Sequence, residues 1–551
     1  MKRYLFLAIA LCGLASCSKE DITEGNTPIH NGEVEESYIA INLSASDITR
    51  AQGGFDDGSE AERAVNHADF FFFDEAGKPF NVTGNPATTP GGGINHLRAI
   101  DVTFSKDGNK DDDISDTSTP VLLLKTYKGQ FPSQIVAVLN WSPDGTTSYS
   151  LDDLHKAVDI QGTFKNAQDA DTNYFVMSNA VYAQGTTEVC ATPLTMENIK
   201  TTESDALASP VNIYVERVAA KVSVIANEKY ALEEGDNPSV HAKILSWDLY
   251  RDNSESTLLK VIDPTWSVDV LGFNWNDSPW YRSYWATSLD APTNDEIFGT
   301  TPLNANAYTY IGENTTGKAT CTKAVIKAQL VNSENKPLEI AIWNNVEYVD
   351  ALTDAQSKGG ESLRIAVANT LKNTYFAMTT DGETTTYTGL KPEDLACVAG
   401  GTDDAPTGVD ANEVYFQLSE TGAAKNWYKL VDGKYKAVAD NIANDANSTK
   451  ATNEALKSVP AAVLYTNGET FYYVDIKHLG NTGKAAEYGI VRNHVYNVTI
   501  KSIKGYGSPV YEGVNFLEYP EISEQNTFVS AQINILSWKL VNQQVDIQPN
   551  N

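Results

Sequence analysis

The sequence predicts an all-β protein with minor helices, built as two β-sandwich-like domains in tandem and followed by one more strand at the C-terminus. Short segments with apolar residues at alternate positions recur between turns rich in Gly, Asn, Asp and Thr, whereas long amphipathic helical patterns are rare. With 551 residues, the chain is also too long for one hydrophobic core. We expect a signal peptide at 1–16, a propeptide at 17–50, domains at 51–225 and 226–520, and a linker and strand at 521–551.

The N-terminus has the pattern of a secretory signal. Lys2 and Arg3 make a basic start, residues 4–11 are apolar, and small residues precede Cys17. The apolar run is too short to span a bilayer. Residues 14–17, Leu-Ala-Ser-Cys, resemble a bacterial lipobox, in which the cysteine thiol is acylated and the cysteine becomes the mature N-terminus. More than one acyl chain on Cys17 would hold the precursor on a membrane. An ordinary signal peptide with a chance cysteine is the alternative.

A predicted strand and then a basic residue follow a polar tether. Residues 18–37 are polar and acidic, which favours a flexible tether. The strand expected at 38–44 has apolar residues on one face, namely Ile39, Ile41 and Leu43. Arg50 lies between this strand and a Gly-rich acidic loop at 51–60, where a bond is accessible to a trypsin-like protease. A lone arginine in a loop is more often only solvated, so by itself it does not establish a cleavage site.

Charge and cysteine content exclude several function classes. The formal net charge is −31, from 72 acidic and 41 basic residues, which opposes binding to nucleic acid or to anionic membranes. Of the five cysteines, Cys12 lies in the signal and Cys17 is the expected lipid site. Cys190, Cys321 and Cys397 are odd in number and widely spaced, so we expect neither a disulfide framework nor a metal cluster.

Five segments of the first domain have the composition of strands. Residues 134–140 are almost continuously apolar and rich in β-branched side chains, which is typical of a central strand. The segment 211–225 is the longest, and we expect it to close the first domain and lead into the second. The other strands are expected at 65–73, 97–104 and 121–124, and a short helix at 152–160.

The second domain begins with the strand-like segment 241–249. Its Ile-Leu-Ser-Trp sequence at 244–247 recurs at 535–538, each time followed by a charged residue and Leu. Two equivalent strands in related domains would explain the repeat, although four residues also recur by chance. A helix is expected at 362–371, and residues 382–453 are expected to be loops around short strands. Strands are expected at 324–330, 338–343, 414–418, 427–431, 470–476 and 491–501.

The last apolar stretch of the chain, Phe528–Ile547, follows a polar run that is typical of a linker. Its apolar residues alternate with a one-residue phase change, as a β-bulge would produce. They are Ile533 and Ile535 before the phase change, then Leu536, Trp538 and Leu540, and finally Val541, Val545 and Ile547. Such a strand needs a covering partner. It closes the sheet of its own domain, or it fills a groove in a neighbouring subunit; the tail alone does not distinguish the two.

No motif of an enzyme or of a cofactor site is present. The seven histidines form no H-x-x-x-H pair, and neither a G-x-S-x-G nor a strand-linked G-x-G-x-x-G occurs. Residues 312–318 have P-loop spacing, but Ala319 replaces the magnesium-binding hydroxyl, which favours a turn. We therefore expect no enzyme activity and no cofactor.

Two further segments have a binding interpretation and a structural one. The acidic residues at 107–113 have part of the spacing of a calcium loop, but the Gly at the sixth position and the distal Glu are missing, which favours a solvated acidic hairpin. The aromatic residues Trp275, Trp280, Tyr281, Tyr284 and Trp285 could stack on sugars, although a packed corner of a β-domain is the more common role of such a cluster. We expect no metal site.

Several short stretches, in their order along the chain, resemble one family. Residues 493–498, Asn-His-Val-Tyr-Asn-Val, followed by Gly-Tyr-Gly-Ser-Pro at 505–509, resemble the closing strand of Bacteroidetes-type fimbrilins, the subunits of type V pili, and in particular their minor-fimbrilin class. Residues 214–222 resemble the strand that joins the two domains of that family, and 283–286 and 310–315 resemble further family stretches. The resemblance implies a transthyretin-like fold for both domains.

The resemblance also implies an assembly mechanism. Such subunits are exported as lipoproteins to the outer membrane, an arginine-specific protease removes the first strand, and the groove accepts the C-terminal strand of the next subunit. Here the matching bond is Arg50–Ala51, with Arg63 as a second possible site, the removed strand is 38–44, and the donor is about 531–547. Identical or related subunits would join head to tail in extracellular fimbriae on the cell surface, where they support adhesion.

Other roles remain possible within and outside the family. A tip or accessory adhesin of the same pilus would share the fold, but the hydrophobic tail favours a stalk subunit. An anchor subunit would keep its lipid and lack the cleavage arginine. A surface glycan-binding lipoprotein is the alternative from another class, and it depends on the aromatic residues between Trp275 and Trp285.

Overall fold

The computed structural model describes most of the chain between the propeptide strand and the C-terminal tail. The described residues are 34–44, 58–82, 93–100, 105–106, 116–127, 129–159, 175–180, 182–184, 187–232, 239–250, 255–261, 307–313, 321–351, 361–410, 413–438, 445–478, 488–509, 528–536 and 540–542. Several predicted features lie outside these residues: Cys17, Arg50, Ala51, the acidic loop 107–113, the aromatic residues 275–285, and Trp538, Val545 and Ile547.

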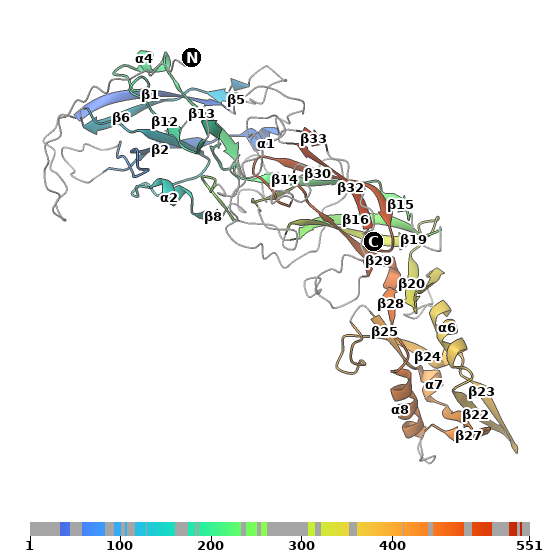
Figure 1. Cartoon of the computed structure of the whole chain (residues 1–551). Helices are drawn as coiled ribbons and strands as arrows, with labels where there is room; N and C mark the ends of the chain where they lie inside the picture. The colour runs from blue at the N-terminus through green and yellow to red at the C-terminus, as the bar shows by residue number, and fades with distance from the viewer. Residues whose placement is uncertain are drawn as a thin grey trace, which may run out of the picture.

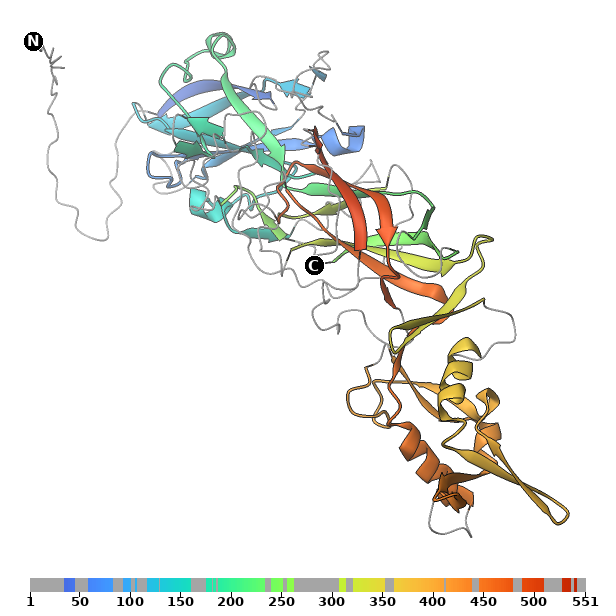
Figure 2. The same ribbon diagram turned by 45° about the vertical axis from the view of Figure 1, so that its right-hand side comes forward.

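The described residues form an elongated body in which strands dominate, so the all-β prediction is confirmed (Figure 1). Three clusters of buried apolar side chains follow one another along this body. We name them the first, second and third core, in order from the end that carries β1 to the opposite end (Figure 2). Within the described part of the chain, none of the helices has the length and hydrophobicity that a membrane crossing requires.

The first core packs against a ten-stranded sheet with the order β3-β2-β7-β9-β13-β1-β5-β4, in which β6 also pairs with β1 and β12 with β7. The run Ile135–Leu139 of β7 is fully buried, as its continuous apolar composition predicts. In place of the helix expected at 152–160, the structure has a single helical turn, α2, which begins after its capping residue Ser150. The strand β8 follows it. The elements are β1 (Val34–Ser44), α1 (Glu60–Arg63), β2 (His67–Phe73), β3 (His96–Ile100), β4 (Ser105–Lys106), β5 (Asp116–Ser118), β6 (Val121–Tyr127), β7 (Gln134–Leu139), α2 (Leu151–Leu154), β8 (Ala157–Asp159), β9 (Met177–Asn179), β10 (Tyr182–Gln184), β11 (Thr187–Val189), β12 (Thr192–Pro193), α4 (Glu203–Leu207) and β13 (Val211–Arg217).

The second core is formed by two five-stranded sheets, β18-β14-β30-β32-β33 and β15-β16-β19-β29-β31. The expected single strand at 211–225 is two strands, because the buried residues Val218 and Ala219 separate β13 of the first sheet from β14 of the second. The elements are β14 (Ala220–Ile225), β15 (Lys229–Ala231), β16 (His241–Tyr250), β17 (Glu255–Thr257), β18 (Thr309–Ile311), β19 (Lys323–Val331), β29 (Glu469–Asp475), β30 (Val495–Lys504), β31 (Ser508–Pro509), β32 (Phe528–Leu536) and β33 (Leu540–Asn542).

A third core lies inside the range expected for the second domain, where the sequence indicates mainly loops. Two sheets, β21-β20-β28-β25-β24 and β23-β22-β26-β27, pack with the helices around the buried Trp343, Phe416 and Trp427. The expected helix at 362–371 is confirmed as α6. The elements are β20 (Leu338–Trp343), β21 (Val346–Ala351), α6 (Glu361–Leu371), β22 (Phe376–Asp381), β23 (Thr384–Gly389), η3 (Pro392–Asp394), β24 (Leu395–Ala399), β25 (Glu413–Leu418), α7 (Glu420–Ala423), β26 (Asn426–Val431), β27 (Lys434–Ala437), α8 (Asp445–Leu456), β28 (Ala462–Tyr465) and η4 (Thr466–Gly468).

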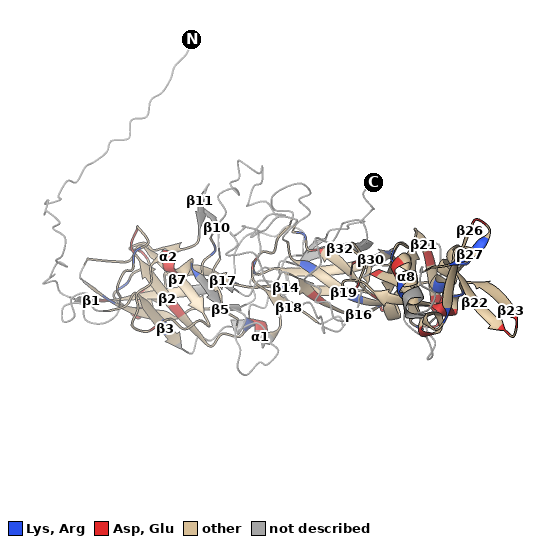
Figure 3. Ribbon diagram, turned by 90° about the horizontal axis from the view of Figure 1, so that it is seen from below, with Lys and Arg blue, Asp and Glu red and all other residues tan. Residues whose placement is uncertain are grey.

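Charged side chains are spread over the whole body. Figure 3 shows Lys and Arg positions on many elements with Asp and Glu positions between them. The net charge of −31 of the whole sequence opposes binding to a polyanion.

Candidate functional site

The strand nearest the N-terminus, β1, lies inside a sheet and not at its edge. On one side, β1 pairs antiparallel first with β6 and then, in the same register, with β5. This pairing runs from Val34 opposite Tyr127 to Ser44 opposite Thr117. On the other side, residues 41–44 pair in parallel with 211–214 of β13. Nearer the start of β1, Lys200 pairs with the same side of the strand. The Tyr38 backbone N–H donates to the Lys200 carbonyl at 2.6 Å, and the Tyr38 carbonyl accepts from Lys200 N at 2.9 Å.

The buried face of β1 is part of the first core. Ile39 and Ile41 are fully buried, as the alternation in the sequence predicts, and both pack in the apolar cluster. Ala40, between them, is also fully buried, so both faces of the strand are covered at this point. Removal of β1 would therefore leave a slot that has apolar walls and an unpaired strand on each side. We call this region, bounded by β5, β6 and β13, the β1 slot.

The C-terminal strand β32 pairs with β30 of its own chain in this uncleaved form. The ladder is antiparallel and runs from Phe528 opposite Lys504 to Leu536 opposite Val495. β32 and β33 lie at the outer side of their sheet, next to β30 alone among the other strands of that sheet. The tail therefore closes the sheet of its own domain here, and it does so at the periphery.

The phase change in the tail is a hairpin and not the expected bulge. β33 turns back on β32, with Leu540 opposite Leu536 and Val541 opposite Ile535. The register shift in this ladder is in β30, between Ile500 and Ser502. Of the predicted donor residues, Ile533, Ile535 and Leu536 lie in β32 and Leu540 in β33. We call β32 and β33 together the tail hairpin. The first copy of Ile-Leu-Ser-Trp, at 244–247, lies in β16 of the other sheet of the second core, whereas Ile535 and Leu536 of the second copy lie in β32, so the two copies are not equivalent strands.

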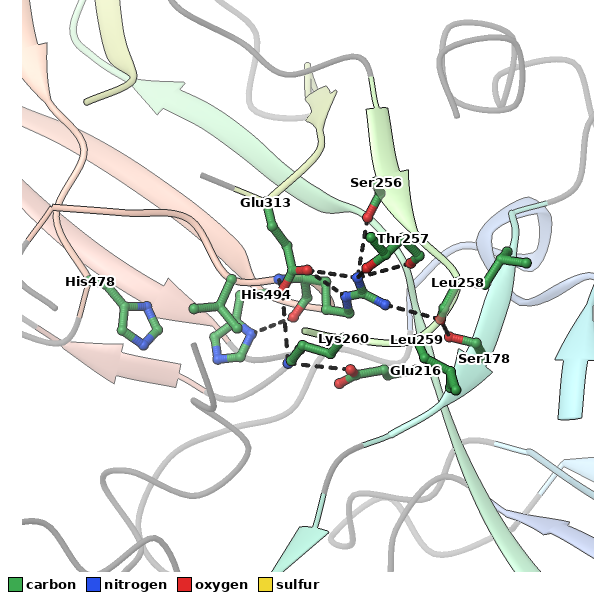
Figure 4. A network of polar contacts seen from close by, with 12 residues as sticks. Ser178, Glu216, Ser256, Thr257, Leu258, Leu259, Lys260, Glu313, His478 and His494 are labelled. Carbon is green, nitrogen blue, oxygen red and sulfur yellow. Dashed lines mark hydrogen bonds and ion pairs between the residues drawn. The ribbon is translucent and has the colours of Figure 1, made fainter. Parts of the chain in front are cut away.

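A buried ionic network joins the first and second cores (Figure 4). The Arg492 guanidinium is fully buried, and its Nε and Nη2 donate to Glu313 Oε2 at 2.8 and 2.7 Å. Lys260 Nζ lies 3.8 Å from Glu313 Oε1 and 3.3 Å from Glu216 Oε1. Because a buried charge is costly without a partner, these four side chains stabilise the fold only as a set.

The same network holds a segment that crosses from the second core to the first, which we call the strap, Glu255–Val261. Its strand β17 pairs with β8 in a separate two-stranded sheet, and its Leu258 and Leu259 belong to the first core. Arg492 Nη2 donates to the Thr257 carbonyl at 3.0 Å, and Arg492 Nη1 donates to the Leu258 carbonyl at 3.4 Å. The strap and the β13–β14 connection thus link the two cores at two separate points.

Two histidines beside this network, the buried His478 and the partly buried His155, are expected to make the stability depend on pH. Burial lowers the pKa of His478 well below its ordinary value, and the neighbouring His494 and Lys260 lower it further. Burial also lowers the pKa of His155, against a smaller opposite effect of its hydrogen bond to the Leu259 carbonyl. The unfolded chain therefore binds protons below about pH 6.5 that the folded chain does not bind.

We expect the free energy of unfolding to fall as the pH is lowered from 7.5 to 5.5. The slope below about pH 6.5 is at most about 1.4 kcal/mol per pH unit for each such histidine. Denaturant unfolding at the two pH values measures this loss, and His478→Gln should make it smaller. His241→Gln, at a site at the edge of the second core, is the control and should leave the loss unchanged. An equal loss in wild type and His478→Gln would contradict this explanation.

The first part of the family-like motif lies at this junction, and its second part, 505–509, follows the other end of β30. The Asn493 backbone N–H donates to the Ala219 carbonyl at 2.6 Å, and its side-chain Oδ1 accepts from Arg217 at 3.2 Å. The Tyr496 hydroxyl lies 2.9 Å from His478 Nδ1. Gly507 has a φ of +72°, and a Cβ there would lie 2.4 Å from the Phe471 carbonyl oxygen, so only glycine fits. The motif therefore has a structural reason at each of these positions.

The junction charges were not predicted from the sequence. Glu216, Arg217 and Lys221 stand in an apolar strand-like run, and charges in such a run are a usable signal for buried ion pairs. Their partners Glu62, Lys260 and Asn493 lie far away in the sequence and have no local pattern. Within the described residues, no group of three or more His, Cys, Asp or Glu side chains could hold a metal ion.

Residues 463–544 match the family model described as major fimbrial subunit protein type IV, fimbrillin, C-terminal. This stretch includes the strands β29 to β33, hence the Gly505–Pro509 motif and the tail hairpin. No curated protein matches the sequence.

Among solved structures, a protein of Parabacteroides distasonis provisionally named as a cell adhesion protein is 12% identical, with 92% of this chain and 98% of that chain covered and a TM-score of 0.39. One of Bacteroides eggerthii with the same provisional name is also 12% identical, covers 96% and 100%, and has a TM-score of 0.31. The tip fimbrial protein Mfa3 of Porphyromonas gingivalis, with a C-terminal truncation, is 14% identical, covers 64% and 99%, and has a TM-score of 0.26. TM-scores this low add nothing to the family match. That match, over the closing strands and the tail, shows that residues 463–544 are similar to the C-terminal part of fimbrillins, and it supports a relationship to the Bacteroidetes-type fimbrilins.

Proposed function

We propose that this fimbrilin is a stalk subunit of the minor-fimbrilin class that polymerises by protease-triggered donor-strand exchange. The observation that supports this most directly is the position of β1, which is an interior strand although it stands near the N-terminus. An interior strand at the end of a chain is covalently attached to the rest on one side only, so one cut can free it. The proposed cut is at Arg50–Ala51, beyond the end of β1 at Ser44.

The β1 slot and the tail have complementary chemistry. A strand added to a sheet gains affinity from backbone hydrogen bonds and selectivity from alternate side chains in pockets. The slot offers the unpaired edges of β6 and β13 and the apolar space left by Ile39 and Ile41. The tail offers alternating apolar residues at Ile533 and Ile535. A C-terminal strand given to the N-terminal domain of the next subunit makes a head-to-tail contact that does not close, and such contacts build a filament.

In the uncleaved chain, neither the β1 slot nor the tail hairpin is available for exchange. β1 fills the slot, and the tail hairpin is paired with β30 of its own chain. Exchange therefore requires that the hairpin leave β30. Residues 510–527 precede it, and eighteen residues can span at most about 60 Å, which is enough for the tail to reach a neighbour. Lipidation at Cys17 would keep the precursor at the outer membrane until the cut releases the subunit.

This function is tested by polymerisation in vitro. Purified chain cleaved with an arginine-specific protease should form ladders on gels that resist mild heating in detergent, whereas Arg50→Ala should stay monomeric. A matched chain that ends at residue 520 should be cleaved but should form no ladder. Monomer alone, from a chain whose N-terminus is Ala51 and whose tail is intact, would refute the stalk function.

A further inference from the structure

Two arginines, Arg50 and Arg63, lie in the sequence between β1 and β2, and each is followed by alanine. Residue type alone does not distinguish them. The structure describes Arg63, which is the last residue of helix α1. A protease binds its substrate as an extended strand, so a bond at the end of a helical turn has to unfold locally before it is cut.

The backbone on both sides of the Arg63–Ala64 bond is hydrogen-bonded to distant parts of the chain. The Glu62 carbonyl accepts from Arg217 Nε at 2.7 Å. The Ala64 carbonyl accepts from Asn140 Nδ2 at 3.0 Å, and Asn66 N donates to Asn140 Oδ1 at 2.8 Å. Both carbonyls that flank Arg63 are thus engaged within the chain. A protease would have to break these bonds before it could make its own.

The Glu62 side chain fixes the helix to the junction between the first and second cores. Lys221 Nζ donates to Glu62 Oε1 at 2.9 Å and to Oε2 at 3.2 Å, and the Tyr310 hydroxyl donates to Oε1 at 2.8 Å. Both Glu62 and Lys221 are 2% exposed. Burial alone would raise the pKa of the Glu62 carboxyl, but the Lys221 charge and the hydrogen bonds outweigh it and lower the pKa, so this carboxyl is ionised at neutral pH.

A capping box links the same carboxylate to the start of the helix. Ser59 N donates to Glu62 Oε2 at 2.6 Å, and Glu62 N donates to the Ser59 hydroxyl oxygen at 3.2 Å. The Glu62 side chain therefore contacts both Ser59, at the start of α1, and Lys221, in β14. We call Glu62 with Lys221, Arg217 and Ser59 the Glu62 clamp.

We propose that the Glu62 clamp protects the Arg63–Ala64 bond and so sets the limit of N-terminal processing. The inference rests on the proposed maturation by an arginine-specific protease, and it identifies Glu62 and Lys221 as positioning residues that determine where maturation stops. Cleavage that removes β1 then leaves the new N-terminal segment attached to the junction through α1. Cleavage at Arg63 would instead release α1 and leave Lys221 without its buried partner.

The test is the initial rate of cleavage at each arginine in the purified full chain. An arginine-specific endoprotease is added, and mass spectrometry follows the products that begin at Ala51 and at Ala64. In wild type we expect the product beginning at Ala51 to form first. Lys221→Met should raise the rate at Arg63 about 100-fold, because the uncompensated Glu62 makes local opening more frequent, and cleavage follows the population of the open form.

A surface variant keeps the test valid if Lys221→Met does not fold. Ser59→Ala removes the capping box at an exposed position and should raise the rate at Arg63 about 3- to 10-fold. Ser150→Ala removes the same kind of capping box from α2, through Ser150 and Asp153, and should leave that rate unchanged. Equal rates at Arg50 and Arg63 in wild type, or no change at Arg63 in either variant, would overturn the clamp. A chain that resists cleavage at Arg50 would count against the proposed maturation and leaves the comparison of rates at Arg63 intact.

Discussion

Arg492→Met is expected to lower the free energy of unfolding by about 3–5 kcal/mol, because it removes one partner of a fully buried ion pair and leaves the other charged. Glu313 would keep Lys260, at 3.8 Å, as a neighbouring cation. The strap would also lose the donors to the Thr257 and Leu258 carbonyls. Denaturant unfolding measures the loss, and unfolding of the first and second cores should separate into two transitions.

Matched variants separate a specific junction effect from the general cost of losing a cation. Lys336→Met removes a surface pair with Glu334 in which both side chains are more than half exposed, and it should change stability by about 0–1 kcal/mol. The double variant Arg492→Met with Glu313→Leu removes both charges and should be less damaging than Arg492→Met alone. If the double variant were as unstable as the sum of the two single ones, the ion pair would not be the cause.

The junction matters for function because a fimbrial subunit accepts a strand at one end and donates one at the other under the proposed mechanism. Tension along a filament would then pass from the first core to the second through Val218–Ala219 and the strap. Arg492 contacts the strap from the residues just before β30, the strand that pairs with the tail hairpin. The buried charges therefore lie on the path between acceptor and donor.

The local sequence pattern is sufficient to predict a strand and its buried face where burial follows from the composition of that one segment. The run 134–140 predicts the central strand β7, and Ile39 and Ile41 predict the buried face of β1. The pattern fails where the partner is distant: Arg492 and Glu313 are 179 positions apart, and neither has a neighbour in the sequence that indicates the pair. The strands β25 and β26 of the third core are short, with adjacent buried residues and no alternation, and polar segments between the strands make the region resemble loops.

The tail shows a second limit of local pattern. A one-residue phase change in an apolar alternation is produced equally by a bulge within one strand or by a tight turn between two. Leu536 and Leu540 are opposite each other in the β32–β33 ladder, so the alternation restarts in β33. The same residues would form one continuous strand if the hairpin opened, and that is the form a donor strand requires.

Removal of β1 from a chain without a tail is expected to destabilise the first core by about 3–6 kcal/mol, since two fully buried isoleucines leave it. The chain would end at residue 520, be cleaved after Arg50, and be refolded without the released fragment. Hydrogen exchange read by mass spectrometry should then show amides of β6 and β13 losing protection about 10²- to 10⁴-fold, because both strands lose their ladder partner.

A synthetic peptide of residues 528–547 should restore that protection in a saturable way, because it fills the β1 slot in place of β1. A peptide with Ile533→Asn and Ile535→Asn has the same backbone hydrogen-bonding groups but lacks two apolar side chains, and it should bind far more weakly. Protection restored in β30 instead of β6 and β13 would mean that the peptide replaces β32 on the sheet of the second core. That result, or equal protection by both peptides, would mean that the tail recognises its own sheet edge and that the slot is not its site.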